Sequence, residues 1–78
     1  MNKLSIISGH HLIATLARCG FVKVRQRGSH VVLKRMRKTG TDVCVVPLHR
    51  ELALGTLKGV LKQAGLSIEE FLSAVKHR

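Results

Sequence analysis

The stretch Arg27-Gly28-Ser29-His30 combines residue types that can hold a phosphate group and move a proton. Histidine side chains titrate near neutral pH, so such a group can act as a general acid or a general base. Arginine guanidinium groups can stabilise the negative charge that develops on a phosphorane. Glycine allows close approach of the backbone, so the amides of Gly28 and Ser29 can contact a phosphate oxygen. His30 is therefore our candidate catalytic residue.

Cleavage of RNA by such a histidine would need no metal ion, because the ribose 2′-hydroxyl next to the scissile phosphorus is an internal nucleophile. The protein would remove the 2′-hydroxyl proton, stabilise the phosphorane and protonate the 5′ oxygen. Gly-Ser-His alone is a weak signal, and an exposed turn histidine is the alternative interpretation of His30.

Other catalytic classes find little support in the sequence. Glu69 and Glu70 are adjacent and Asp42 and Glu51 are isolated, which excludes a carboxylate pair for two-metal or acid–base chemistry. Ser29 lacks the acidic third member of a triad. No glycine loop of the nucleotide-binding kind is present.

We expect no metal and no cofactor. His10 and His11 are neighbours on a predicted helix and point about 100° apart, so a solvated surface is the simpler interpretation. Cys19 and Cys44 belong to no zinc-binding spacing. A disulfide between them is conceivable, but we expect two reduced thiols, which behave as small hydrophobic groups.

Charge indicates the class of partner. The chain has 14 Lys and Arg against 4 Asp and Glu, a net charge of +10 that is spread along the whole sequence. Such an excess favours a polyanion, which can be nucleic acid, an anionic membrane or an acidic protein. The alternative is a basic protein whose charges only solvate it. We see neither a signal peptide nor an apolar run of membrane-spanning length, so we expect a cytoplasmic protein with no membrane partner.

Three stretches, 21–27, 30–35 and 42–48, have the residue pattern of β-strands. In the first two, apolar side chains alternate with polar ones, which predicts one face for a core and one for solvent. The expected buried face carries Val22, Val24, Val31 and Leu33. The expected open, basic face carries Lys23, Arg25, Arg27, His30 and Lys34.

Helices are predicted on both sides of these strands. Apolar residues at helical spacing indicate one helix between Ser8 as N-cap and Gly20, and a second that ends at Gly65. Ser67 and Glu70 form a capping box for a third. Short connections between the strands require an antiparallel meander.

The fold class is therefore α+β, a two-layer α-β-β-β-α arrangement with a terminal helix, in which helices cover one face of a three-stranded antiparallel sheet. From the length we expect residues 1–78 to form one domain. A chain this short buries only about 60% of its unfolded surface, so any site must be an open face or a shallow groove. Phe21 and Phe71 are expected in the core, which disfavours recognition by base stacking and favours phosphate contacts. The basic hairpin 34–42 is expected to add such contacts.

Five blocks of the sequence resemble, in order and at family spacing, the HicA-type (YcfA-like) toxins of bacterial toxin–antitoxin pairs. They are Gly20-Phe21, Arg25-Gln26-Arg27-Gly28-Ser29-His30, Val45-Val46-Pro47-Leu48-His49, Gly55-Thr56-Leu57 and Leu61-Lys62-Gln63-Ala64-Gly65-Leu66-Ser67. The resemblance implies a fold like that of a double-stranded-RNA-binding domain and a ribosome-independent mRNA interferase. It implies His30 as the catalytic residue and an acidic HicB-type antitoxin as the protein partner.

Several assignments stay open at this point. RNA-binding residues are expected to be Lys23, Arg25, Arg27, Gly28, Ser29 and Lys34. His49, at a family-like Pro-x-His position, is either a second acid–base group or, as we favour, a residue that fixes its loop. Lys34, Arg27, His49 or water could act as the general acid. The alternative functions are a non-catalytic RNA-binding module and a domain that binds only an acidic protein.

Overall fold

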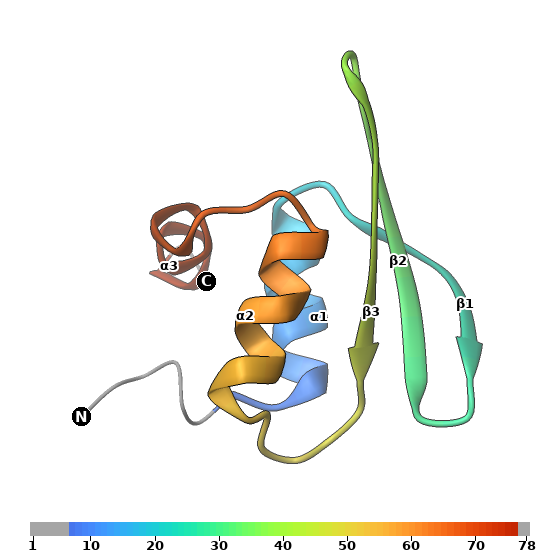
Figure 1. Ribbon diagram of the computed structural model, residues 1–78, viewed down its shortest axis with the longest axis vertical. Coiled ribbons are helices and arrows are strands. Elements are labelled where there is room, and N and C mark those ends of the chain that lie inside the picture. Colours follow the sequence, from blue (N-terminus) through green and yellow to red (C-terminus); the bar gives the residue numbers. More distant parts are fainter. Residues whose placement is uncertain (1–6, 77–78) are drawn as a thin grey trace.

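The computed structural model describes residues 7–76, which form three helices and a three-stranded sheet (Figure 1). The elements are α1 (Gly9–Arg18), β1 (Val22–Arg27), β2 (His30–Arg37), β3 (Gly40–Pro47), α2 (Leu54–Gln63) and α3 (Ile68–Lys76). The predicted α+β class and element order are confirmed.

The sheet is an antiparallel meander with strand order β1-β2-β3, as predicted. Its second hairpin is longer than expected, because pairing continues to Arg37 opposite Gly40. Only Lys38 and Thr39 remain for the turn. Gly40 has a φ of 149°, a value that side-chain-bearing residues rarely adopt, so the glycine permits this tight reversal at the start of β3.

The helix boundaries follow the predicted capping residues. At the start of α1 the Ser8 hydroxyl accepts a hydrogen bond from the His11 amide at 3.0 Å. Gly20 and Gly65 follow α1 and α2 with φ values of 96° and 69°, the left-handed conformation expected of glycine after a helix. The hydroxyl and amide of Ser67 bond reciprocally with Glu70, which confirms the capping box of α3.

Helices α1 and α2 lie against one face of the sheet, mainly over β3, and α3 packs against α1 farther from the sheet (Figure 1). The core combines side chains from all these layers: Ile7, Leu12, Leu16, Phe21, Val31, Leu33, Cys44, Val46, Leu52, Leu57, Val60, Leu61, Ala64, Leu66 and Phe71. Both aromatic side chains are buried, as predicted. The apolar side of α3 is only partly buried, since Phe71 is buried but Ile68 remains 40% exposed.

The prediction that the valines of β1 are buried is wrong. Val22 is 62% exposed and Val24 is 51% exposed, and every residue of β1 is exposed. The two helices that face the sheet lie nearest to β3, so β1, at the opposite edge, extends beyond their cover (Figure 1). Alternating hydrophobicity identified the strand correctly, but it does not reveal how many strands a helix layer can cover.

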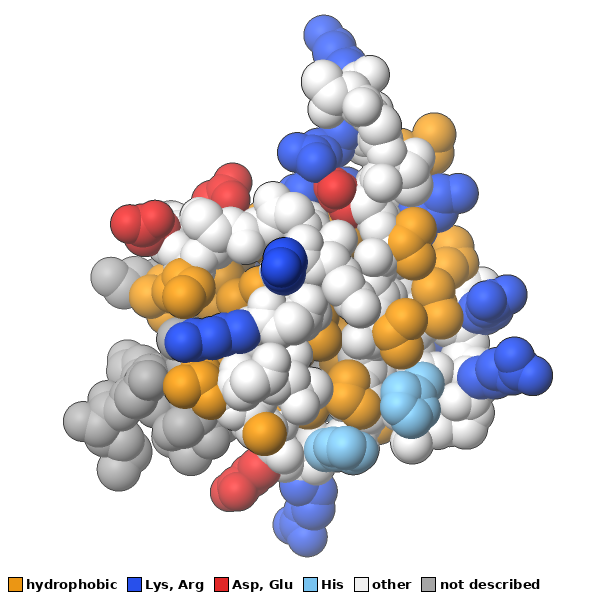
Figure 2. All heavy atoms as spheres, viewed as in Figure 1, with side chains coloured by type: hydrophobic (Ala, Val, Ile, Leu, Met, Phe, Trp, Pro, Cys, Tyr) orange, Lys and Arg blue, Asp and Glu red, His pale blue; other side chains and the backbone are white. Residues whose placement is uncertain are grey.

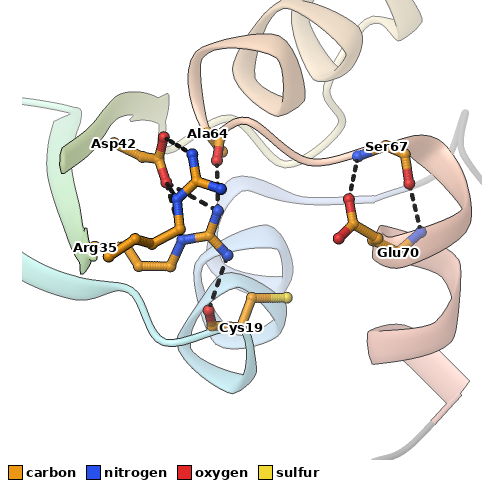
Figure 3. Close-up of polar contacts among 7 residues, drawn as sticks. Cys19, Arg35, Asp42, Ala64, Ser67 and Glu70 are labelled. Carbon is orange, nitrogen blue, oxygen red and sulfur yellow. Dashed lines mark hydrogen bonds and ion pairs between the residues drawn. The ribbon is translucent and has the colours of Figure 1, made fainter. Parts of the chain in front are cut away.

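Arg35 in β2 organises a cluster that joins the sheet to two helix ends (Figure 3). Its guanidinium donates to the Asp42 carboxylate at 2.9 Å and 3.1 Å, to the Cys19 carbonyl at 3.3 Å and to the Ala64 carbonyl at 3.1 Å. The guanidinium carbon also lies 4.8 Å from the centre of the Phe21 ring, within the range of a cation–π contact.

The partners of Asp42 are arginines, an arrangement that the sequence analysis did not predict. Arg37 makes a second ion pair with this carboxylate at 2.8 Å. Hydrogen bonds from Arg35, then from Arg37, hold the pKa of Asp42 below its ordinary value of 3.8. Arg35 and Asp42 are direct cross-strand neighbours in this hairpin. Their ion pair could therefore be predicted once the hairpin register was known.

The outer edge of β3 is partly covered by α2. The Val45 amide, which points away from β2, donates to the side-chain oxygen of Gln63 at 3.1 Å. Pro47 ends the same strand and has no amide proton to donate, so its position at the strand end suits a proline.

Candidate nucleic-acid interface

His30 is the first residue of β2 and is exposed at one end of the sheet. It pairs with Arg27 across the first hairpin and with Pro47 across the second, so its backbone is held from both sides. Gly28 has a φ of 57°, which suits glycine and allows the two-residue turn that precedes His30. The predicted strand–turn–histidine arrangement is therefore present.

Strand register determines which side chains share the open face with His30, because directly paired residues project to the same side of a sheet. Arg25 pairs with Val32, and Arg27 pairs with His30, so both arginines lie on this face. Apolar groups also lie on it. Val43 and Val45 are 48% and 36% exposed, opposite Lys34 and Val32 respectively. Val22 of β1, which pairs with Lys34 and is 62% exposed, is a third apolar group on it. The open face thus combines the arginines of β1 with apolar side chains of β1 and β3, rather than being uniformly basic.

The space-filling view agrees with this mixed character (Figure 2). Lys and Arg side chains project at the side where β1 lies in Figure 1, and hydrophobic side chains are visible over the neighbouring part of the sheet. Histidine side chains appear near its lower end.

Lys23 does not lie on the open face, and this prediction is wrong. Lys23 pairs with the buried Leu33 and the next pair is Arg25 with Val32, so Val24 is an extra residue in a β-bulge. The bulge reverses the alternation, and Lys23 faces the helix side together with Gln26. Its ammonium group donates to the Gln26 side-chain oxygen at 3.0 Å.

Gln26 supports the turn and was missed by sequence reasoning. Its amide nitrogen donates to the Gly28 carbonyl at 3.0 Å while its oxygen accepts from Lys23. This pair of hydrogen bonds ties the turn to the helix-side face of β1, where the strand extends beyond the helices and is exposed. A glutamine between two arginines gives no sequence signal of its own, because the contact depends on the bulge at Val24.

The loop after β3 is fixed beside the same turn. The Leu48 amide donates to the Ser29 carbonyl at 2.7 Å, and the Gly9 amide donates to the His49 carbonyl at 2.9 Å. A side chain at Gly9 would contact the Pro47 carbonyl oxygen and approach the Leu48 Cα to 2.9 Å, so only glycine allows α1 to start here. The His49 backbone thus helps to position its loop, and its side chain is exposed.

Lys34 shares the open face with His30 but lies four residues farther along β2. At about 3.3 Å per residue, this separation is roughly 13 Å. Lys34 and His30 therefore suit different phosphates of one bound strand rather than the same one.

The cysteines are free thiols, as expected: Cys44 is buried and Cys19 is half-buried. Burial raises the pKa of Cys44 to about 11, so its thiol stays protonated at neutral pH. Within residues 7–76, no group of three or more His, Cys, Asp or Glu side chains is arranged to hold a metal ion. None of the helices in the same range has the length and apolar character needed to cross a membrane.

A family model described as HicA toxin of bacterial toxin–antitoxin matches residues 9–66, from the first residue of α1 to the residues that follow α2. This range includes the whole sheet, the turn at Gly28 and His30. A comparison with curated individual proteins found no match.

Proposed function

The chain belongs to the HicA toxin family of bacterial toxin–antitoxin systems, and from that premise we propose that it is an endoribonuclease that cleaves mRNA with His30 and without a metal ion. The main support is the position of His30, exposed at the end of an open face and paired with Arg27. If a strand of RNA lay on this face, one of its phosphates would be close to both the His30 imidazole, which can transfer a proton, and the Arg27 guanidinium.

His30 acts as the general base in this proposal. It removes the proton from the 2′-hydroxyl, whose oxygen attacks the adjacent phosphorus. The bond from phosphorus to the 5′ oxygen then breaks, which leaves a 2′,3′-cyclic phosphate and a 5′-hydroxyl end. Arg27 stabilises the phosphorane, and the amides of Gly28 and Ser29 approach its oxygen atoms.

The 5′ oxygen takes its proton from a second donor. Arginine does not release a proton in proteins, which removes Arg27 from this role. Lys34 is excluded as the donor because it lies roughly 13 Å from His30 along β2. We therefore assign the proton to His49 or to water, and replacement of His49 by alanine distinguishes the two by its effect on kcat.

The protein partner in this proposal is an acidic antitoxin of the HicB type. The net charge of +10 favours an acidic protein as it does RNA. The mixed basic and apolar character of the open face suits such a protein, because exposed apolar side chains gain little from a phosphate backbone.

The decisive experiment compares cleavage of single-stranded RNA by the wild type and by His30→Ala in EDTA, with circular dichroism to establish that both are folded. His10→Ala, which removes an exposed histidine from α1, is the matched control. We expect the wild type and the control to cut and His30→Ala to be inactive. A substrate with a 2′-deoxy sugar at the scissile position should resist cleavage.

Equal cleavage by the wild type and folded His30→Ala would refute the catalytic assignment. Binding of RNA without cleavage by any of the three proteins would identify a non-catalytic RNA-binding module. Negligible affinity for RNA together with tight antitoxin binding would identify a pure protein-interaction domain.

A further inference from the structure

The end of the second hairpin forms a projecting arm, which we define as residues 36–41. In Figure 1 it extends well past the helices, along the longest dimension of the molecule, which is 37 Å. Pairing continues to Arg37 opposite Gly40, so the arm is a regular two-stranded ribbon up to its two-residue turn. Such a ribbon holds its tip at a defined distance from the rest of the sheet.

The charges of the arm divide into two groups. Arg37 and the adjacent Arg35 share the carboxylate of Asp42, on the side of the sheet that faces the helices. Lys38 in the turn and Lys34 at the base of the arm are exposed and make no ion pair among the described residues. These two lysines are therefore the groups available to a polyanion.

The open face continues onto the arm. Side chains alternate along β2, so Lys34 and Met36 lie on the same side as His30. Met36 is 79% exposed, which shows that no other described part of the chain packs over this side of the arm. A ligand bound at His30 can thus follow β2 to the tip without crossing a helix.

We propose that the arm and its base form a second RNA-binding site, which holds the strand through Lys38 in the turn and Lys34 at the base, at a distance from the bond that is cut. This inference rests on the proposed function. Eight residues separate His30 from Lys38, which corresponds to roughly 26 Å along the strand. A stacked nucleic-acid strand advances roughly 3.4 Å per nucleotide, so the tip meets a phosphate about eight nucleotides from the one at His30.

RNA fits the arm better than an acidic protein does. Lysine is a strongly hydrated point charge that suits phosphate groups, and the two free lysines follow one line with the candidate catalytic residue. The arm offers only Met36 as a large exposed apolar side chain, whereas Val22, Val43 and Val45 lie on the part of the open face nearer to His30. Tight binding should therefore depend on RNA length, because an RNA much shorter than the distance from His30 to Lys38 contacts only the His30 end.

The test measures RNA affinity in a His30→Ala background, so cleavage does not interfere. Fluorescence anisotropy is recorded with labelled single-stranded RNA of about 5 and about 20 nucleotides, which are shorter and longer than the proposed span. Lys38→Ala is compared with Lys58→Ala, which removes the same charge from the exposed surface of α2.

We expect Lys38→Ala to weaken binding of the long RNA roughly fivefold at low salt and to reduce the salt slope by about 0.7, with no effect on the short RNA. Lys58→Ala should leave both affinities close to those of the background protein. Equal affinities of the two variants for long RNA, or equal losses on short and long RNA, would overturn the proposal. So would a Lys38→Ala protein that binds long RNA normally but the antitoxin weakly, because the arm would then belong to the protein interface.

This experiment separates the arm from the catalytic assignment. If His30→Ala still cleaved RNA at the wild-type rate, the proposed role of His30 would fail. The dependence of binding on RNA length and on Lys38 would be unaffected by that failure.

Discussion

Strand β2 connects two basic regions that use their charge in opposite ways. At Arg35 the guanidinium is surrounded by a carboxylate, two main-chain carbonyls and an aromatic ring, and its side chain is 15% exposed. At the His30 end, Arg25 and Arg27 are exposed and make no ion pair within residues 7–76. The first region holds elements together, and the second leaves its charge available to a ligand. A count of basic residues therefore overstates the surface that is available to RNA.

The difference arises from what surrounds each arginine. Cys19 caps the C-terminal end of α1 and Ala64 caps that of α2. Carbonyl groups at helix C-termini lack helical partners and carry partial negative charge, so a cation is favourable there. Arg35 satisfies one carbonyl from each helix while it pairs with Asp42 in the adjacent strand. Among residues 7–76, no helix C-terminal carbonyl accepts a hydrogen bond from Arg25 or Arg27, and β1 extends beyond the helix layer (Figure 1).

The largest expected effect is that of Arg35→Met. This substitution leaves two main-chain carbonyls without their donor and Asp42 with only the more exposed Arg37, so we expect a loss of roughly 3 kcal/mol in the free energy of unfolding. In a domain of this size, the loss corresponds to a Tm lower by about 15 °C. Thermal unfolding followed by circular dichroism measures it.

Arg25→Met is the matched control, because it removes the same group from the exposed end. We expect it to change the free energy of unfolding by less than about 0.5 kcal/mol. Equal destabilisation by both variants would show that the two regions do not differ in the way described.

A smaller effect is expected from acid. Because the hydrogen bonds from Arg35 and Arg37 lower the pKa of folded Asp42, its ionised form stabilises the fold at pH values above the ordinary carboxyl pKa of 3.8. This contribution decreases as the pH falls below that value, towards the lower pKa of the folded state. The Ser67 amide and hydroxyl lower the pKa of Glu70 and give a contribution of the same sign.

Urea denaturation of the wild type and Asp42→Asn at several pH values isolates the Asp42 contribution. We expect the difference between their free energies of unfolding to be constant near neutral pH and to shrink below roughly pH 4. A difference that stayed the same down to pH 2 would contradict the role given to the Asp42 charge.

The smallest effect concerns the two sides of β1. On the proposed function, Arg25→Ala should weaken RNA binding about threefold in moderate salt, because Arg25 faces the same side as His30. Lys23→Ala should weaken it less, since the bulge at Val24 turns Lys23 to the other side. Anisotropy titrations with one RNA compare them directly, and a larger loss for Lys23→Ala would place RNA on the helix side of β1.

Local patterns predicted the elements well. Capping residues are read from sequence because their bonds are local, as between Ser8 and His11 or between Ser67 and Glu70. Period-two alternation identified the strands, and the exposed histidine after a glycine turn was found at the expected place. The family resemblance then agreed with the match over residues 9–66.

The features that were not predicted all depend on contacts between elements. Nothing in the alternating run of β1 marks Val24 as a bulge, so Lys23 was placed on the wrong face and the role of Gln26 was missed. The partners of Arg35 come from four different elements or their ends, which residue spacing does not bring together. The catalytic role of His30 and the RNA contacts stay predictions that the experiments above address.

The hydrogen bond between Gln63 and the outer edge of β3 also has a consequence for self-association. Unpaired edge strands rich in β-branched residues are templates on which further copies of a chain can aggregate. Residues 43–46 form such a segment, and the Val45 amide at its centre donates a hydrogen bond to the Gln63 side chain. One helical glutamine thus blocks a backbone donor of this edge, and we expect the contact to disfavour edge-to-edge pairing of two copies.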